Sequence, residues 1–249
     1  MSLQFDSIED VDELGSQLII SVHMTVVWRD NFIYWNDSNT PGCDHIYAPE
    51  QWLWKPDITL MNAAQDFEDS MMPTDLFVTS SLDALVASQN VSGNVFQARP
   101  GIISSICKMD FTLFPFDTQV CKLTFGSNMY GSWPGGISLT FIENATRGFN
   151  GPGTIMRDTF ESISWEVISV TSYSSVDVRP YFGETTLLHW DVKLNRYTSY
   201  YYATAIAPNL AITSIALLAL WISDLGSRLG LTITAMLTVV AVLVCIYCY

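Results

Sequence analysis

The chain has 249 residues, of which 25 are acidic and 11 are basic, and its formal net charge is −14. Because nucleic acid attracts basic surfaces, this charge argues against a nucleic-acid partner, and we expect none. The charge is unevenly distributed, since only Asp224 and Arg228 are charged from Tyr197 onward. The sequence therefore divides into an acidic part, residues 1–198, and a nearly uncharged end.

The acidic part contains short runs rich in valine, isoleucine, threonine and aromatic residues, separated by turn residues. This spacing predicts antiparallel strands, and the length is sufficient for one domain with a core. We expect an all-β, immunoglobulin-like sandwich over residues 1–198. The runs are Leu18–Val27, Ile102–Ile106, Val120–Phe125, Ile137–Phe141, Trp165–Ser172 and Thr186–Leu194.

Three Asn-x-Ser/Thr triplets begin at Asn36, Asn90 and Asn144, all before the uncharged end. Such triplets are acceptors for N-linked glycans in secreted domains. Their one-sided placement predicts that the acidic part is extracellular and glycosylated at these asparagines.

Cys107 and Cys121 enclose thirteen residues, with Phe114-Pro115-Phe116 near the middle. Proline restricts the backbone, so the two phenylalanines lie on a stiff turn. A disulfide closing a loop of this size contributes about 3 kcal/mol by constraining the unfolded chain. From these residues alone, the segment is either an ordinary structural disulfide or a rigid loop whose apolar tip presses on an apolar surface.

The end of the chain contains two apolar runs, Tyr200–Ile222 and Leu229–Tyr249. A helix over the first run is about 35 Å long, and the hydrocarbon core of a bilayer is about 30 Å thick. Buried core helices are the alternative. Two such runs after an acidic domain favour membrane helices, which we place at residues 199–223 and 227–249.

The sequence contains no HExxH, Gly-x-Ser-x-Gly or phosphate-binding glycine motif, and its three histidines are scattered. We therefore expect no enzyme activity and no cofactor. Weak calcium binding by Asp10, Asp12 and Glu13 is an alternative to a solvated acidic turn, which we favour; we assign no metal site.

Five features, in this order along the chain, resemble the Cys-loop receptors, the pentameric ligand-gated ion channels, and are closest to the nicotinic-like branch. The resemblance implies that Cys107 and Cys121 form a disulfide. The features are the tryptophans Trp28 and Trp35, the motif Trp54-Lys-Pro-Asp57, the cysteine loop, the run Arg196-Tyr-Thr-Ser-Tyr200-Tyr201 followed by Pro208, and Ser227–Leu237.

The resemblance implies that the second apolar helix lines the pore. Steps of four and three residues from Gly230 reach Thr234, Leu237 and Ala241, which therefore form one stripe along the helix. The family match assigns the pore threonine to Thr234 and the gating leucine to Leu237. Five copies of Leu237 would form a hydrophobic ring that closes the pore by dewetting. A stripe that packs against lipid or another helix is the alternative.

The sequence indicates the charge of the permeant ion less directly than it indicates the pore helix. Cation-selective relatives carry a glutamate where this sequence has Ser227, and anion-selective relatives carry Pro-Ala where it has Gly226-Ser227. The Phe-Pro-Phe-Asp sequence of the cysteine loop resembles the cation-selective branch. An acidic outer domain also concentrates cations. We expect a cation channel, with an anion channel as the alternative.

The resemblance places a ligand site between subunits. Nicotinic-like members surround a quaternary ammonium with aromatic side chains. Here the corresponding positions include Asn128, Met61 and His23, so we expect either a larger, softer or more polar small-molecule agonist or none known. For Met61 and His23, simple packing is an equal alternative to ligand contact. The site residues we assign are Met61, Asn128, Tyr130, Arg179, Tyr181 and Phe182 on the principal side, and His23, Phe96 and Gln97 on the complementary side.

The resemblance also implies a path from the ligand site to the pore. Glu13 occupies the place of an acidic residue that pairs with Arg196, and a broken pair of this kind leaves an unpaired charge. Leu14 and the tip Phe114-Pro115-Phe116 would press on the membrane helices. An exposed ion pair is the alternative.

The chain ends within the second helix, whereas the family has four, so we expect the remaining helices in a longer protein. The partners implied are four further subunits, which we expect to be identical, a small-molecule agonist, permeant ions and the lipid bilayer. The expected location is the plasma membrane, with the large domain outside. A non-conducting ligand-binding or auxiliary subunit is the remaining alternative.

Overall fold

The structure is a computed structural model. It describes the chain except for residues 34, 36–42, 44, 81–92, 132–135, 143–151, 158, 159, 161, 163, 180–182, 248 and 249. The described residues form two compact units. One unit is a β-sandwich of residues 1–110 and 118–195, and the other contains residues 111–117 and 196–249.

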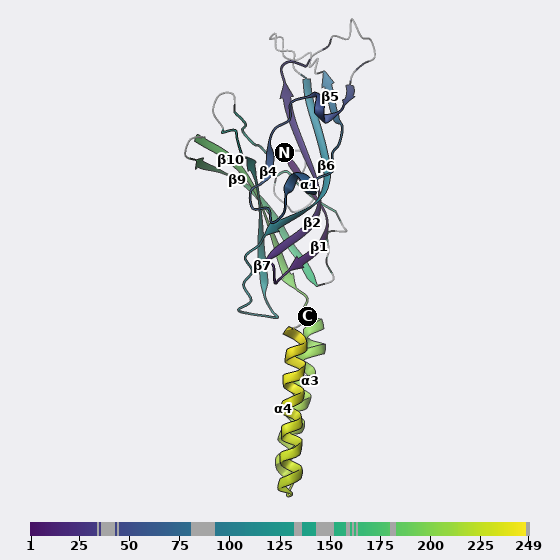
Figure 1. Cartoon of the computed structure of the whole chain (residues 1–249), viewed down its shortest axis with the longest axis vertical. Helices are drawn as coiled ribbons and strands as arrows, with labels where there is room; N and C mark the ends of the chain where they lie inside the picture. The colour runs from purple at the N-terminus through teal and green to yellow at the C-terminus, as the bar shows by residue number, and fades with distance from the viewer. Residues whose placement is uncertain are drawn as a thin grey trace. The chain divides into compact units, whose positions relative to one another are not determined.

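The β-sandwich consists of a six-stranded and a four-stranded sheet, as predicted (Figure 1). The strand order is β3-β5-β6-β2-β1-β8 in the first sheet and β4-β7-β10-β9 in the second. The strands are β1 (Ser2–Asp12), β2 (Gln17–Asp30), β3 (His45–Ala48), β4 (Ile58–Leu60), β5 (Leu76–Ser80), β6 (Gly93–Ile106), β7 (Thr118–Ser127), β8 (Thr154–Met156), β9 (Trp165–Arg179) and β10 (Gly183–Arg196). A 3₁₀ turn, Glu50–Trp52, and the short helix α1, Phe67–Ser70, lie between strands.

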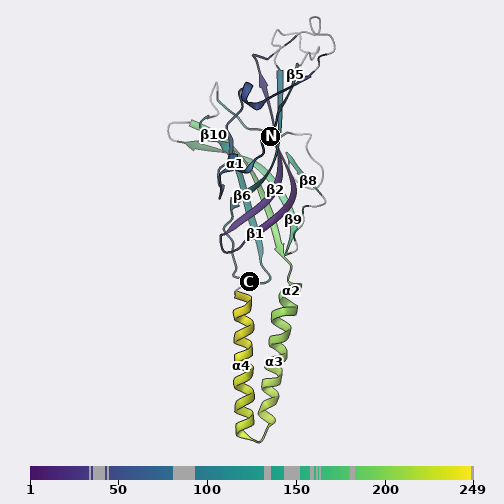
Figure 2. The ribbon, with the colours of Figure 1, turned by 45° about the vertical axis from the view of Figure 1, so that its right-hand side comes forward.

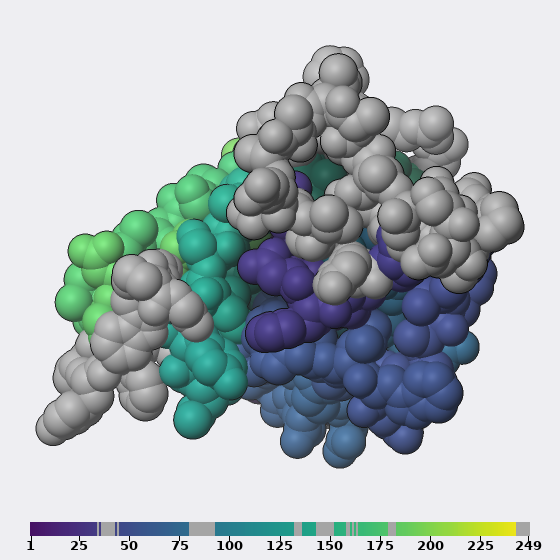
Figure 3. Space-filling model, turned by 90° about the horizontal axis from the view of Figure 1, so that it is seen from above, coloured from purple at the N-terminus to yellow at the C-terminus, as the bar shows by residue number. Residues whose placement is uncertain are grey.

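Alternating side chains build the core between the sheets. Along β2, every second residue from Leu18 to Val26 is buried, and along β10 Leu188, Trp190 and Val192 are fully buried. This period-two pattern is what a strand with one buried face requires. Seen from above, the teal and green residues lie on one side and the purple and blue residues on the other (Figure 3).

β1 was not among the predicted strands, and its alternation of buried and exposed residues is irregular. The strand pairs antiparallel with β2, but the register shifts between Phe5 and Ser7 and again between Ile8 and Asp10. Each bulge moves the following side chains to the other face of the sheet. The buried positions of β1 therefore do not follow a simple period.

The strand predicted over Ile137–Phe141 is wrong, because this segment is irregular. Leu139 is buried in the core, and the ring of Phe141 lies 5.3 Å from that of Trp190. The apolar alternation therefore reflects real burial. The segment's backbone bonds with Met1, which lies outside the strands.

The second unit contains two apolar helices joined by a short turn. They lie side by side in Figure 2 and overlap in the view of Figure 1. The first runs through α2 (Ser199–Tyr201), a π-helical turn (Tyr202–Ile206), α3 (Ala207–Leu218) and a 3₁₀ turn (Ala219–Trp221). The second is α4, Leu225–Tyr247. Both are long and apolar enough to cross a membrane, over Ser199–Trp221 and Leu225–Val242.

The π-helical turn directly precedes Pro208. The proline ring clashes with the carbonyl four residues before it, which belongs to Thr204. The wider turn, in which the amide of Ala207 donates to the carbonyl of Tyr202, relieves this clash and keeps the helix continuous.

Candidate functional site

A buried ion pair lies where the cysteine loop meets the first apolar helix. The guanidinium of Arg196 donates two hydrogen bonds to the carboxylate of Asp117, Nε to Oδ1 at 2.7 Å and Nη2 to Oδ2 at 3.1 Å. The two side chains are only 1% and 2% exposed. A two-pronged contact of this kind is among the strongest that side chains make.

Two aromatic rings complete the surroundings of Arg196. Its guanidinium carbon lies 4.9 Å from the ring centre of Phe114 and 5.6 Å from that of Tyr201. The two rings meet edge to face at 5.0 Å, and Nη1 donates to the hydroxyl of Tyr201 at 3.3 Å. The tip of the cysteine loop is therefore tied to the first turn of the membrane helix through one arginine.

Asp117 was not predicted as the partner of Arg196. The pairing follows from strand register, because Asn195 on β10 lies opposite Thr118 on β7. One step further brings Arg196 opposite Asp117, whose carbonyl accepts from the Arg196 amide at 3.3 Å. The acidic residue that ends Phe-Pro-Phe-Asp was the available signal. The predicted contact of Arg196 with Glu13 stays a prediction.

The disulfide implied by the resemblance joins Cys107 and Cys121. Within the loop, Phe114 and Phe116 are 40% and 61% exposed. Leu14 lies in the turn between β1 and β2 and is fully exposed. Their role in pressing on the membrane helices stays a prediction.

Asp57 organises the turn that carries two predicted ligand residues, Asn128 and Tyr130. Its carboxylate accepts from the Ser127 hydroxyl at 2.5 Å and from the backbone amides of Asn128 and Met129 at 3.1 and 2.9 Å. The Ser127 hydroxyl in turn accepts from the amide of Tyr130 at 2.9 Å. Asp57 is thus a positioning residue for this turn. Met61, also predicted, lies just after β4, and its amide donates to the carbonyl of Thr124.

We expect Asp57→Asn to loosen this turn. The new amide presents a donor to groups that are themselves donors, and each unsatisfied group costs about 1–3 kcal/mol. Backbone hydrogen exchange over residues 128–130 should accelerate, with strands β7 and β10 unaffected. Asp75→Asn is the matched control, because Asp75 is exposed. Unchanged exchange in the Asp57 variant would contradict the assigned role.

His23, predicted for the complementary side, belongs to a charged cluster on the outward face of β1 and β2. A ring nitrogen of His23 contacts the Asp6 carboxylate. Asp6 also pairs with Nε of Arg157 at 2.9 Å and accepts from the amide of Gln4 at 2.9 Å. Asp6 is 13% exposed, whereas His23 and Arg157 are 39% and 57% exposed. The cluster presents two basic side chains to solvent around a nearly buried acid.

Phe96 and Gln97 are neighbours on β6, so their side chains point to opposite faces. Phe96 joins a row of outward rings, 5.8 Å from Phe77, which lies 5.4 Å from Tyr47. Gln97 is 5% exposed and donates to the carboxylate of Glu50 at 3.2 Å. Only Phe96 therefore shares the outward face of the sheet with His23.

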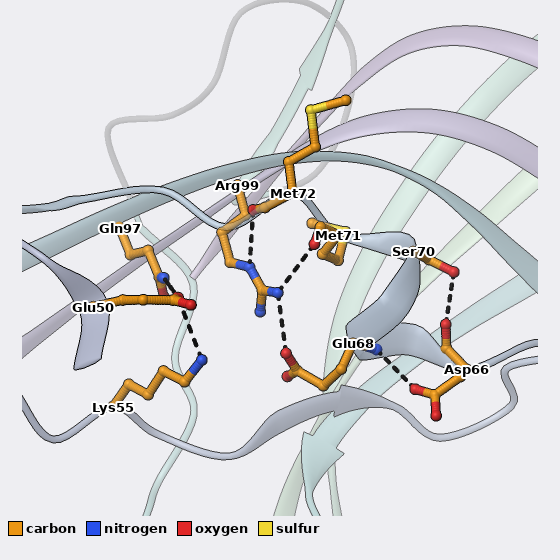
Figure 4. A network of polar contacts seen from close by, with 9 residues as sticks. All are labelled: Glu50, Lys55, Asp66, Glu68, Ser70, Met71, Met72, Gln97 and Arg99. Carbon is orange, nitrogen blue, oxygen red and sulfur yellow. Dashed lines mark hydrogen bonds and ion pairs between the residues drawn. The ribbon is translucent and has the colours of Figure 1, made fainter.

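The surroundings of Gln97 form a polar network (Figure 4). Glu50 also accepts from Lys55, and the buried Arg99 pairs with Glu68 at 3.0 Å. Arg99 additionally donates to the carbonyls of Met71 and Met72. This network holds α1 and the chain that follows it against β6.

Several predicted residues lie outside the described residues. These are Tyr181 and Phe182, predicted for the principal side of the ligand site, and the sequon asparagines Asn36, Asn90 and Asn144. Arg179 ends β9, and its side chain is likewise not described.

The predicted pore stripe lies on an open face of α4. Gly230, Thr234, Leu237 and Ala241 are all exposed, and a β-carbon added to Gly230 would meet nothing within 4 Å. The partly buried residues lie about half a turn away, on the side that packs against the first helix. These are Arg228, Leu231, Thr232, Ala235, Val239 and Val242.

Asp224 caps the start of α4. Its carboxylate accepts from the backbone amide of Ser227 at 2.8 Å, which is the usual bond of a helix-capping residue. Hydrogen bonds from the side chain and backbone of Ser227 hold the pKa of Asp224 below its ordinary value of 3.8. An exposed, ionised carboxylate therefore stands one turn before Arg228.

The chain is similar to known receptor subunits. Residues 1–198 match the model of the neurotransmitter-gated ion-channel ligand binding domain. The chain is 30% identical to the human neuronal acetylcholine receptor subunit alpha-9, an alignment that covers 98% of this chain and 47% of that protein. It is 29% identical to the rat subunit beta-3, over 98% of this chain and 48% of the relative. It is also 29% identical to the human subunit alpha-3, over 95% of this chain and 43% of that protein.

The chain thus spans about half the length of the curated relatives it matches. The matched domain is the β-sandwich, and the alignments continue through the two apolar helices. The chain belongs to the neurotransmitter-gated ion-channel family, as a Cys-loop receptor subunit of the nicotinic-like branch.

Proposed function

We propose that the chain is a subunit of a cation-selective pentameric channel, opened by a polar small molecule that binds between subunits. Family membership makes it a channel subunit rather than an enzyme, embedded in the membrane with its ligand-binding domain outside. The observation that carries the proposal is the buried Asp117–Arg196 pair, because it joins the cysteine loop to the helix that precedes the pore helix. Five identical subunits suffice, since one chain carries residues for both sides of the site.

Pore lining by α4 is supported by the open stripe of Gly230, Thr234, Leu237 and Ala241. Cation selectivity is supported by the ionised carboxylate of Asp224 at the start of α4, five copies of which would attract cations. The net charge of −14 acts in the same direction. We place the protein in the plasma membrane, with glycans on the three sequon asparagines.

Conduction is tested by voltage clamp of cells that express the complete protein. Replacing external sodium with a large organic cation should shift the reversal potential of the ligand-evoked current, whereas replacing chloride should not. A shift with chloride alone would identify an anion channel. Surface pentamers that bind ligand but pass no current would identify a non-conducting receptor.

The ligand is proposed to be polar and not a quaternary ammonium, because His23 stands where the resemblance places a tryptophan, and both His23 and the nearby Arg157 face solvent. A fixed positive charge repels an ammonium group, and cation–π attraction requires an aromatic face. The guanidinium of Arg157 instead suits an acceptor group such as a carboxylate or carbonyl.

We expect Arg157→Gln and His23→Ala each to weaken the response to the active ligand by roughly tenfold, the loss of one charge-assisted hydrogen bond. The measurement is the concentration for half-maximal current over a panel of polar and anionic small molecules, with acetylcholine and choline included. Arg29→Gln is the control, because Arg29 is exposed at the end of β2. Activation by acetylcholine with unchanged sensitivity in both variants would refute the polar site.

A further inference from the structure

An unusual histidine lies on the outward face of the four-stranded sheet. His189 alternates with Leu188 and Trp190, which face the core, yet its own side chain is also buried, with the residue only 8% exposed. It is covered by neighbouring strands rather than by the core. None of the roles assigned above involves it.

The imidazole of His189 joins three strands. One ring nitrogen, Nδ1, lies 3.0 Å from the hydroxyl of Thr124 on β7, directly opposite in the strand register. The other, Nε2, lies 2.7 Å from the hydroxyl of Ser175 on β9. Hydroxyl groups donate or accept as required, so a neutral imidazole satisfies both bonds in either tautomer.

The surroundings disfavour a positive charge on this ring. Tyr173 on β9 stacks on the imidazole at 4.8 Å, and the ammonium of Lys122 on β7 lies 5.5 Å from the centre of the same tyrosine ring. Burial first, and then Lys122, lower the pKa of His189 below its ordinary value of 6.5, while Asp191 acts in the opposite direction. Lys122 stays charged, because a hydrogen bond with Tyr173 raises its pKa above 10.5.

Nearby acidic groups do not cancel the lowering of the His189 pKa. Asp191 lies beside His189 on β10 and opposite Lys122 in the register, and Asp177 is two residues beyond Ser175 on β9. The Oδ1 atom of Asp191 is buried without a hydrogen-bond partner among the described residues. Asp191 therefore acts on both Lys122 and His189, and its effect on the pKa of His189 is smaller than those of burial and Lys122.

We propose that His189 is a proton-binding regulatory site, at which protonation releases β9 from β10 and β7. An open arrangement exposes the ring to water and binds the proton more tightly, so acid shifts the equilibrium toward it. The sign follows from the lowered pKa: the closed arrangement is fully favoured above pH 6.5 and is progressively weakened as the pH falls below this value. At a pH below both pKa values, the ratio of open to closed protein rises about tenfold for each unit by which the pKa of His189 in the open arrangement exceeds that in the closed one.

The consequence for ligand response rests on the proposed function. β9 ends and β10 begins on either side of Tyr181 and Phe182, which were predicted to bind ligand, so acid that separates the two strands should weaken ligand binding. The strand-level test below needs neither ligand nor current. A failure of the proton site is therefore distinguishable from a failure of the channel assignment.

The test uses the complete protein in detergent or nanodiscs at about pH 7.5 and about pH 5. Backbone hydrogen exchange, corrected for its intrinsic pH dependence, should accelerate at the lower pH over residues 172–177 and 187–191. This acid effect should disappear in His189→Gln, which is neutral at both values. His45→Gln is the matched control, because His45 is exposed on β3 and should retain the effect.

A second measurement tests the proposal even if His189→Gln does not fold, because it uses the native protein. Exchange at the imidazole C2 position, followed by mass spectrometry, reports the pKa of each histidine in the native protein. That of His189 should lie below 6.5, rise in Lys122→Gln and fall further in Asp191→Asn. A pKa of 6.5 or above, or an acid effect that persists in His189→Gln, would overturn the proposal.

Discussion

Replacing Leu237 with threonine should produce a standing current in cells that express the complete protein, without any ligand. Leu237 is 65% exposed on the face of α4 that points away from the first membrane helix. Five such leucines facing one axis would form a dry constriction, and five hydroxyl-bearing side chains would hold water there. The closed state should lose the contacts that stabilise it.

The free energy lost by replacing five leucines is large enough to shift the equilibrium between closed and open channels. Moving a closed-to-open ratio from 99:1 to 1:99 requires about 5.5 kcal/mol, or roughly 1 kcal/mol from each of five subunits. Burying a leucine side chain is worth about 1.5–3 kcal/mol. Losing part of that contribution in each subunit is therefore enough to reverse the equilibrium.

Met236→Thr is the matched control for this experiment. Met236 is adjacent in sequence and 75% exposed, but it points about 100° away around the helix. It should leave the resting current unchanged. Pentamers that reach the cell surface and stay silent with Leu237→Thr would contradict the gate assignment, and a standing current with Met236→Thr would show that the stripe is misplaced.

Breaking the Asp117–Arg196 pair should strongly destabilise the protein. Asp117→Asn preserves the shape but leaves a buried guanidinium without its counter-charge, which costs about 3–5 kcal/mol. We expect a lower melting temperature and little surface expression. Arg196→Lys should also be harmful, because an ammonium cannot reproduce the two-pronged bond or stack on Phe114 and Tyr201.

A double variant separates stability from signalling. In Asp117→Leu with Arg196→Met, no charge is left unpaired, so stability should return to about the original level. If the pair serves as a switch, this double variant should bind ligand without opening. Normal opening would show that the pair is only structural.

Glu68→Gln provides the control for these ion-pair variants. Its partner Arg99 is also buried, but Glu68 is 56% exposed and Arg99 keeps its bonds to two backbone carbonyls. We expect a loss below about 1 kcal/mol, as for other exposed pairs. If Glu68→Gln lost as much stability as Asp117→Asn, the exposure of the acidic residue would not determine how much stability is lost when the pair is broken.

Local patterns in the sequence sufficed for much of the architecture. The short runs rich in valine, isoleucine, threonine and aromatic residues that form β2, β7 and β10 predicted a sandwich, because such residues favour half-buried strands. The uncharged runs predicted two apolar helices, because a bilayer excludes charge over a fixed length. The positions around Gly230 and Leu237 could be placed on one helix face from helical geometry alone.

Long-range contacts decided the rest. The bulges of β1, the buried side of Gln97 and the irregular course of Ile137–Phe141 depend on neighbours distant in sequence. Asp117 meets Arg196 only through the β7–β10 register, which also places His189 opposite Thr124. A burial pattern reveals that a residue faces a neighbour but not which one, so these partners became visible only when the strands were paired in space.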